Sequence, residues 1–176
     1  MCIRDRVFIP EKVILWDWNG TLLDDAATCM DIMNAMLDSR SMPQLNLELY
    51  KEVFGFPVIE YYKKVGFDLT SDSFEELSIE FIDGYNRALG QASLAQHAMK
   101  VLDYFSVEGK EQIIISAMKQ DMLLKSVEAK GISGYFTAIL GIDDIYAATK
   151  SKIAIDYVKE KKIGTGRYGI YRRYHT

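Results

Sequence analysis

The stretch Val13–Leu22 reads Val-Ile-Leu-Trp-Asp-Trp-Asn-Gly-Thr-Leu and holds the residues of this chain best suited to chemistry. Four apolar residues predict a short buried strand, and Asp17 follows at its carboxyl end, where open α/β sheets bind ligands. Gly20 lets backbone N–H groups approach an anion, and Thr21 adds a hydroxyl donor. An aspartate beside such donors suits phosphoryl transfer through an aspartyl-phosphate. A strand that ends in Asp and turns through Asn-Gly is also an ordinary strand terminus.

The elements that must position Asp17 alternate between strand and helix in the second half of the chain. Strands are predicted at Lys12–Asp17, Gln112–Ser116 and Tyr135–Leu140, and helices around residues 94–105, 119–130 and 149–161. This alternation predicts a parallel sheet with crossover helices, hence an α/β fold. Residues 24–90 show helical spacing throughout, which predicts a helical unit inserted after the first strand.

Two further positions could join Asp17 at the same edge of the sheet. Ser116, followed by Ala117, ends a predicted strand, and parallel strands converge at their carboxyl ends. Lys150 or Lys152, at the start of the last predicted helix, could neutralise charge on a transferring phosphate. The alternatives are a serine that caps the following helix and lysines on a solvated surface.

Composition limits the partners to be expected. The chain has 176 residues, 49% hydrophobic and 26% charged, with a formal net charge of −4, as in a soluble globular protein. We therefore expect neither nucleic acid nor an anionic membrane as a partner. The sequence has no apolar run long enough to span a bilayer and no secretory signal. Cys2 and Cys29 are expected to be free thiols, typical of a cytoplasmic protein.

Residues 12–162 resemble the haloacid dehalogenase (HAD) superfamily, with phosphoglycolate-phosphatase-like hydrolases as the nearest relatives. Motif I of that superfamily is a hydrophobic strand followed by Asp-x-Asp-Gly-Thr-Leu, and Asp17 with 20–22 matches it. Ser116 corresponds to motif II and Lys150 to motif III; the run 144–150 favours Lys150 over Lys152. The resemblance implies a three-layer Rossmann-like core of residues 7–23 and 91–162, with residues 24–90 as a C1 cap.

The resemblance also implies a Mg²⁺-dependent phosphatase that acts on a small phosphorylated metabolite. Asp17 would be the nucleophile and a Mg²⁺ ligand, and the backbone carbonyl of Asn19 would be a second ligand. The residues expected to hold the phosphate are Gly20, Thr21, Ser116, Ala117 and Lys150, with Lys150 also counted as catalytic. Asn19 departs from the motif, because an amide cannot act as the general acid and base of the second aspartate. The departure implies slow turnover, a good leaving group or another acid. Asp24 and Asp25 lie too far along the chain to be named as that acid.

The two ends of the chain are expected to be foreign to this fold. Residues 1–6 resemble a translated sequencing adapter. No Gly-Asp of motif IV follows Lys162, and the tail 163–176 has neither helical nor strand period. Codons can be chosen for Arg167–Thr176 such that a one-nucleotide shift encodes Asp-Met-Val-Tyr-Ile-Gly-Asp-Thr-Thr. We therefore expect a frameshift near 162–166, with an out-of-frame tail and the C-terminal core strands missing.

This truncation would leave the first strand on an open edge of the sheet. We then expect the intact parent to be a monomer, and this chain to aggregate or dimerise. Two alternative functions stay open: a dehalogenase or phosphonate hydrolase of the same superfamily, and a non-catalytic or defective HAD-like fragment. The aromatic residues Tyr61, Tyr62 and Phe67 of the insert are either a substrate pocket or, as we favour, the insert's own core.

Overall fold

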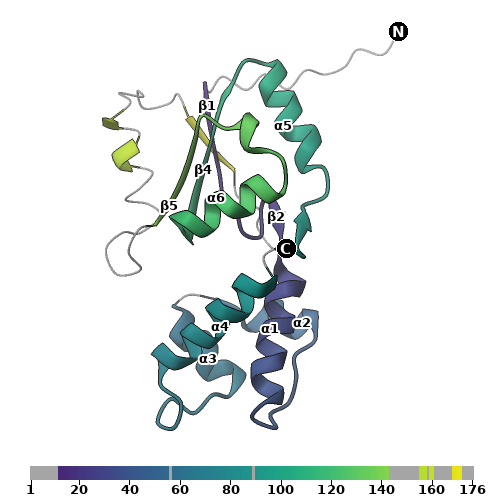
Figure 1. Cartoon of the computed structure of the whole chain (residues 1–176), viewed down its shortest axis with the longest axis vertical. Coiled ribbons are helices and arrows are strands. Elements are labelled where there is room, and N and C mark those ends of the chain that lie inside the picture. Colours follow the sequence, from purple (N-terminus) through teal and green to yellow (C-terminus); the bar gives the residue numbers. More distant parts are fainter. Residues whose placement is uncertain are drawn as a thin grey trace. The chain divides into compact units, whose positions relative to one another are not determined.

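The computed structural model describes residues 12–55, 57–88, 90–142, 155–157, 159–160 and 168–171. The chain divides into two compact units, drawn in Figure 1. The first, here called the sheet unit, comprises Met1–Leu22 and Gln96–Arg173. The second, here called the helical unit, comprises Leu23–Ala95 with Tyr174–Thr176. No helix among these described residues is long and apolar enough to cross a membrane.

Within the described residues, the sheet unit is built on four parallel strands. They are β1 (Val13–Trp16), β4 (Glu111–Lys119), β5 (Ala138–Ile142) and β6 (Tyr168–Tyr171), in the order β5-β4-β1-β6. All three neighbouring pairs are parallel, so the predicted parallel α/β sheet is confirmed. In the register of β1 and β4, Trp16 lies opposite Ile114, and β4 continues past that point toward Ser116.

One face of the sheet packs against two helices, one immediately before β4 and one immediately after it in the chain. These are α5 (Ala98–Val107) and α6 (Gln120–Ala129), and a short 3₁₀ turn, η1 (Ser133–Tyr135), precedes β5. Both crossovers advance in the same direction across the sheet, so right-handed connections place both helices on one face. The rings of Trp16 and Phe105 meet edge to face at 5.8 Å, a contact worth about 0.5–1.5 kcal/mol beyond its burial.

The opposite face carries the alternate residues of the same strands. Its core cluster consists of Val13, Leu15, Ile113 and Ile115, and Ala138, Leu140 and Tyr157 pack against it. Tyr157 belongs to a helical segment at 155–157. The sheet unit is therefore layered on both sides, as the three-layer prediction requires, and β1 is buried along its whole length.

The strand β6 corrects one expectation about the C-terminal segment. Tyr168–Tyr171 pairs in parallel with β1, so the predicted open edge of β1 on that side is wrong. The edge of a strand carries unpaired N–H and C=O groups that favour any extended neighbour. Four residues are too few to show a period, yet Tyr-Gly-Ile-Tyr contains the aromatic and β-branched types that suit a strand.

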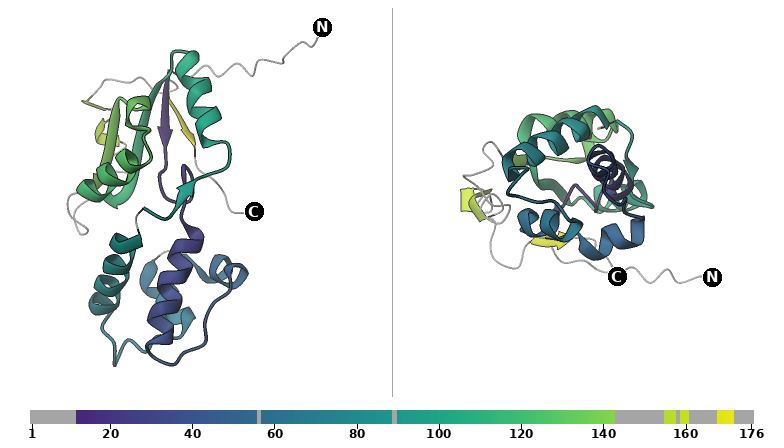
Figure 2. Two further views of the ribbon diagram at one scale, coloured as in Figure 1. Left: turned by 45° about the vertical axis from the view of Figure 1, so that its right-hand side comes forward. Right: turned by 90° about the horizontal axis from the view of Figure 1, so that it is seen from below.

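The helical unit contains four helices and a two-stranded ribbon within the described residues. The helices are α1 (Ala26–Asp38), α2 (Leu47–Val53), α3 (Val58–Val65) and α4 (Phe74–Ala88), and Figure 2 shows them in two further views. The ribbon joins β2 (Leu23–Asp24) to β3 (Ser93–Leu94) in antiparallel pairing. The helix predicted from residue 94 therefore begins only at Ala98, because the chain first pairs with the segment leaving β1.

Local signals explain where these helices begin and end. Asn46 caps α2 by accepting a hydrogen bond from the backbone N–H of Leu49 at 2.8 Å. Ser73 and Glu76 bond each other's backbone N–H groups at 3.2 Å, the reciprocal arrangement of a capping box before α4. Gly66 ends α3 with a left-handed φ of 110°.

Aromatic side chains fill the core of the helical unit. Tyr61, Tyr62 and Phe67 are 3%, 2% and 5% exposed, and their rings contact one another in sequence. Tyr50 meets Tyr61 edge to face at 6.1 Å. The interpretation of these residues as core rather than as an open pocket is therefore confirmed.

Candidate functional site

Asp17 follows β1 directly and is half-buried in the sheet unit. Its neighbours on both sides are anchored tryptophans. Trp16 donates its indole N–H to Gln112 Oε1 at 3.0 Å, and Gln112 in turn donates to the carbonyl of Leu102 at 3.1 Å. Trp18 is fully buried and donates to Ser126 Oγ at 3.1 Å. The aspartate is thus held between two side chains whose polar atoms are paired inside the core.

The residues after Trp18 form a tight turn. The carbonyl of Trp18 accepts from the backbone N–H groups of Thr21 at 3.2 Å and Leu22 at 3.0 Å. Gly20 has a φ of 68°, a left-handed conformation that glycine adopts without strain. Because Trp18 and Leu22 are both buried, the half-buried segment 19–21 is fixed at its two ends.

Ser116 links the second strand to this turn. It is 1% exposed, and its hydroxyl donates to Asn19 Oδ1 at 3.3 Å and accepts from the backbone N–H of Met118 at 3.0 Å. Helix α6 begins only at Gln120, with no side-chain cap at Lys119, so Ser116 is not a helix cap. This contact joins Ser116 to the loop after β1, whereas its role at a phosphate beside Asp17 stays a prediction.

The remaining predicted residues divide by whether the structure describes them. Ala117 follows Ser116 and is exposed. Lys150 and Lys152 lie outside the described residues, so the choice between them stays a prediction. Asp25, which lies too far along the chain to be named as a substitute acid, belongs to the helical unit, where its buried carboxylate accepts from the hydroxyl of Tyr85 at 2.8 Å.

Two residues near the site were missed by the sequence analysis. The Gln120 side chain donates to the carbonyl of Ile139 at 3.0 Å and accepts from the N–H of Gly141 at 2.6 Å. A Cβ at Gly141 would lie 2.6 Å from the carbonyl oxygen of Met118. A glycine inside a strand often marks such a close approach, and this was the available signal.

The oxygen donors of the turn after β1 suit Mg²⁺. The turn offers the carboxylate of Asp17 and the backbone carbonyl of Asn19, both hard oxygen ligands. Across the described ranges there is no cluster of three or more His, Cys, Asp or Glu residues that could hold a metal by itself. Mg²⁺ commonly takes one or two carboxylates and completes its shell with water and substrate phosphate. The residues present therefore fit such an ion.

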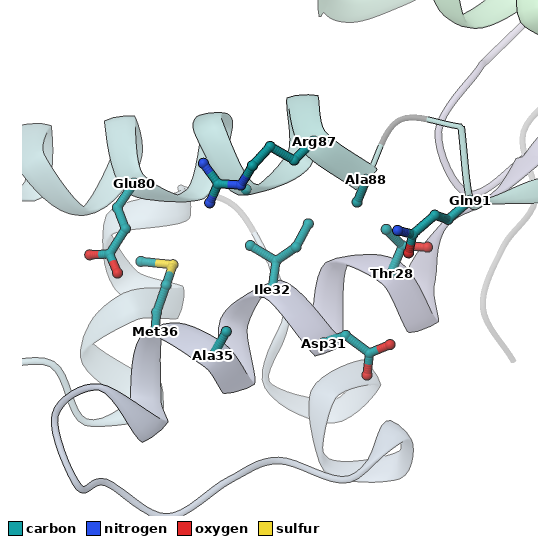
Figure 3. Close-up of a pocket in the computed structure, with 10 residues that line it drawn as sticks. Thr28, Asp31, Ile32, Ala35, Met36, Glu80, Arg87, Ala88 and Gln91 are labelled. Atoms are coloured by element: carbon teal, nitrogen blue, oxygen red, sulfur yellow. The ribbon is translucent and has the colours of Figure 1, made fainter.

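The helical unit has a separate hollow of about 280 Å³ between α1 and α4. In Figure 3, Ile32 points from α1 toward α4, with the Arg87 side chain on the other side of the gap. The helices approach closely here, since a Cβ at Gly84 would lie 2.7 Å from Ile32 Cγ2. The lining combines Asp31 and Glu80 with Arg87 and carries none of the predicted site residues.

A family model for haloacid dehalogenase-like hydrolases matches residues 14–164, which is most of the chain. The chain belongs to this family. A hydrolase of the haloacid dehalogenase-like family from Streptococcus pneumoniae has a similar structure, with a TM-score of 0.79 at 15% identity over 92% of this chain and 75% of that one. A predicted phosphoglycolate phosphatase from Haemophilus somnus 129pt gives 0.72 at 17% identity, over 92% and 76%. At these identities the likeness shows the HAD fold alone.

A curated relative is similar in sequence over a shorter stretch. It is an N-acetylmuramic acid 6-phosphate phosphatase from Pseudomonas putida, 34% identical over 77 residues. The match covers 43% of this chain and 34% of the relative's length. This member of the HAD-like hydrolases thus matches about a third of that phosphatase.

Proposed function

We propose that this chain carries the phosphate site of a hydrolase acting on small phosphate monoesters, with Asp17 as the nucleophile. The carboxylate would attack phosphorus and form an aspartyl-phosphate, which water then hydrolyses. The family membership and a phosphatase among the curated relatives support the reaction class. The position of Asp17 at the carboxyl end of β1, held by its buried neighbours, supports the assignment of the nucleophile.

The observation that carries this proposal is the hydrogen bond between Ser116 and Asn19. It brings Ser116 of β4 to the turn after β1, so one anion could meet donors from both segments. In the proposed site the phosphate is held by the segment Gly20–Thr21, by Ser116 and Ala117, and by Lys150. Mg²⁺, held by Asp17 and the Asn19 carbonyl, would supply charge neutralisation at the phosphate.

The helical unit is proposed to act as the cap of this hydrolase. It is inserted between β1 and the rest of the sheet unit in sequence, which is where the family resemblance places a C1 cap. We infer that the cap selects a small phosphorylated metabolite.

The test is release of inorganic phosphate from p-nitrophenyl phosphate by the full chain in Mg²⁺ buffer. We expect Asp17→Asn to abolish the release, because an amide is a poor nucleophile. Asp83→Asn is the matched control, since Asp83 is exposed on α4, outside the proposed site, and the same charge is removed. Phosphate release that survives Asp17→Asn would refute the nucleophile.

A second candidate function is phosphate binding without turnover, and the amide at Asn19 favours it. In that case beryllofluoride with Mg²⁺ would bind and raise the stability of the sheet unit, while no ester would be cleaved. Both tryptophans of the chain lie in this unit, so their fluorescence reports its unfolding separately.

A further inference from the structure

The described segments of the proposed site offer few side chains that could transfer a proton. In the segment 17–21 and at Ser116–Ala117, the described residues with polar side chains are Asp17, Asn19, Thr21 and Ser116. Among these described residues Asp17 alone carries an acidic or basic side chain. If Asp17 is the nucleophile, its carboxylate becomes the phosphorylated group and cannot serve as the base.

The side chain of Asn19 contacts Ser116 of β4. It lies two residues after Asp17 and accepts the hydroxyl hydrogen of Ser116. An amide neither gives up nor takes a proton at neutral pH. The Ser116 hydroxyl, which also accepts from the Met118 N–H, is likewise no base near neutral pH.

Two carboxylates that are close in sequence to these segments have partners of their own. Asp25 is buried in the helical unit, and its carboxylate accepts from Tyr85. Asp121, at the start of α6, is exposed and lies 3.9 Å from the ammonium group of Lys119. The partners of these two carboxylates, Tyr85 and Lys119, lie outside the segments 17–21 and 116–117.

We propose that the chain forms a long-lived phosphoenzyme at Asp17, so that it acts as a phosphoryl carrier charged by activated donors such as acyl phosphates. This inference rests on the proposed function, because it requires Asp17 to be the nucleophile. It differs in outcome, since the phosphorylated protein rather than free phosphate is the main product of the first minutes of reaction.

The first step needs no proton donor when the donor is an acyl phosphate. An oxygen of Asp17 forms a new bond to phosphorus, and the bond from phosphorus to the bridging oxygen of the donor breaks. The electron pair of that bond leaves with the carboxylate product, which is a stable anion. An alkyl phosphate would instead release an alkoxide, which requires a proton, so such esters should react poorly.

The second step is the slow one. Water must attack phosphorus while the bond between phosphorus and the Asp17 oxygen breaks, and the attacking water must lose a proton. Asn19 cannot accept that proton. General base catalysis is typically worth about 10²–10⁴-fold, so loss of the phosphoryl group should be slower by that factor than with a carboxylate at position 19.

The experiment follows the intact mass of the full chain after mixing with acetyl phosphate in Mg²⁺ buffer. We expect most of the protein to gain the mass of one phosphoryl group, and hydroxylamine to remove it, as for an acyl phosphate. Asn19→Asp should lower the phosphorylated fraction and speed release of inorganic phosphate by about 10²–10⁴-fold. Asp17→Asn should show no added mass.

Asn86→Asp is the matched control for the added charge. Asn86 is exposed on α4 in the helical unit, and the substitution should leave the phosphorylated fraction unchanged. Because Gly20 follows Asn19 and Asn-Gly peptides readily lose their amide, the peptide containing residue 19 is checked by mass before the assay. Only protein with the amide intact is compared.

The outcomes separate the two proposals. Phosphorylated wild-type protein, with rapid turnover in Asn19→Asp, supports both. Rapid phosphate release by the wild type without added mass, abolished in Asp17→Asn, overturns the long-lived phosphoenzyme and leaves the hydrolase in place. If neither the wild type nor Asn19→Asp gains mass or releases phosphate, both proposals fail. Added mass that persists in Asp17→Asn likewise overturns both.

Discussion

The hydroxyl of Ser116 donates to Asn19 Oδ1 over 3.3 Å and so joins two segments that are 97 residues apart in sequence. Ser116 lies in β4 beyond its pairing with β1, and Asn19 lies in the turn that follows β1. The same hydroxyl accepts from the Met118 N–H. One side chain therefore fixes both the turn after Asp17 and the backbone after Ser116.

We expect Ser116→Ala to destabilise the sheet unit by about 1–3 kcal/mol. The substitution leaves the Met118 N–H and the Asn19 amide without their shared partner, and unsatisfied buried polar groups cost about that much. The measurement is urea unfolding followed by tryptophan fluorescence, which reports the unit holding both Trp16 and Trp18. Ser106→Ala, exposed on α5, is the control and should change the midpoint little. Equal midpoints for Ser116→Ala and the wild type would contradict the prediction.

Much of the sheet unit was predictable because its signals are local. The apolar run of β1, the acidic residue after it and the Gly-Thr turn all lie within ten residues, and the structure confirms β1. The β-branched run of β4 was equally clear, although the strand extends to Lys119. These signals fixed the strand that positions Asp17 and the fold class.

The features that escaped prediction depend on contacts between distant segments. The strand β6 pairs with the edge of β1, and the four residues of β6 are too few to show an alternating apolar pattern. Trp18 donates to Ser126, a side chain far away in the sequence. The Gln120 side chain binds main-chain atoms of β5. No pattern in one segment specifies such partners.

Gly141→Ala should disturb the loop between Ser116 and α6. The added Cβ would lie 2.6 Å from the Met118 carbonyl oxygen and 2.8 Å from Gln120 Cα, both backbone atoms that cannot move aside cheaply. We expect a loss of about 1–3 kcal/mol in the stability of the sheet unit, as for other overpacked sites. Gly134→Ala is the control, because a Cβ there meets no atom within 4 Å. The two variants are compared by urea unfolding with tryptophan fluorescence, and similar losses in both would argue against the clash.

The Cys29 thiol of the helical unit should resist alkylation until the solution is strongly alkaline. Burial, together with the nearby carboxylate of Asp25, raises the pKa of the Cys29 thiol from 9.0 to about 12. At pH 8 the thiolate fraction is then roughly 10³-fold below that of an unfolded chain, because each pKa unit is a factor of ten. Because the pKa of the Cys29 thiol is higher in the folded than in the unfolded chain, protonation of this thiol favours folding. Its contribution to stability is fully present below pH 9 and is lost as the pH rises toward 12.

Alkylation with iodoacetamide, followed by mass analysis of the peptide containing Cys29, measures this directly. We expect slow labelling in the folded protein at pH 8 and rapid labelling of the same peptide in urea, where the burial that raises the pKa is gone. The ratio of the labelling rate in urea to the rate in the folded protein should fall as the pH increases above 9. The unfolded thiol is then already ionised, whereas the ionised fraction of the folded thiol still rises with pH.

Tyr85→Phe should speed labelling of Cys29 in the folded protein. It removes the hydroxyl that donates to the buried carboxylate of Asp25 at 2.8 Å, and the loss of this hydrogen bond should loosen the start of α1. Phe81→Leu is its control, because it removes a half-buried ring that stacks on Tyr85 and leaves the Tyr85 hydroxyl in place. If folded and urea-unfolded protein are labelled at the same rate at pH 8, the thiol is not buried as described.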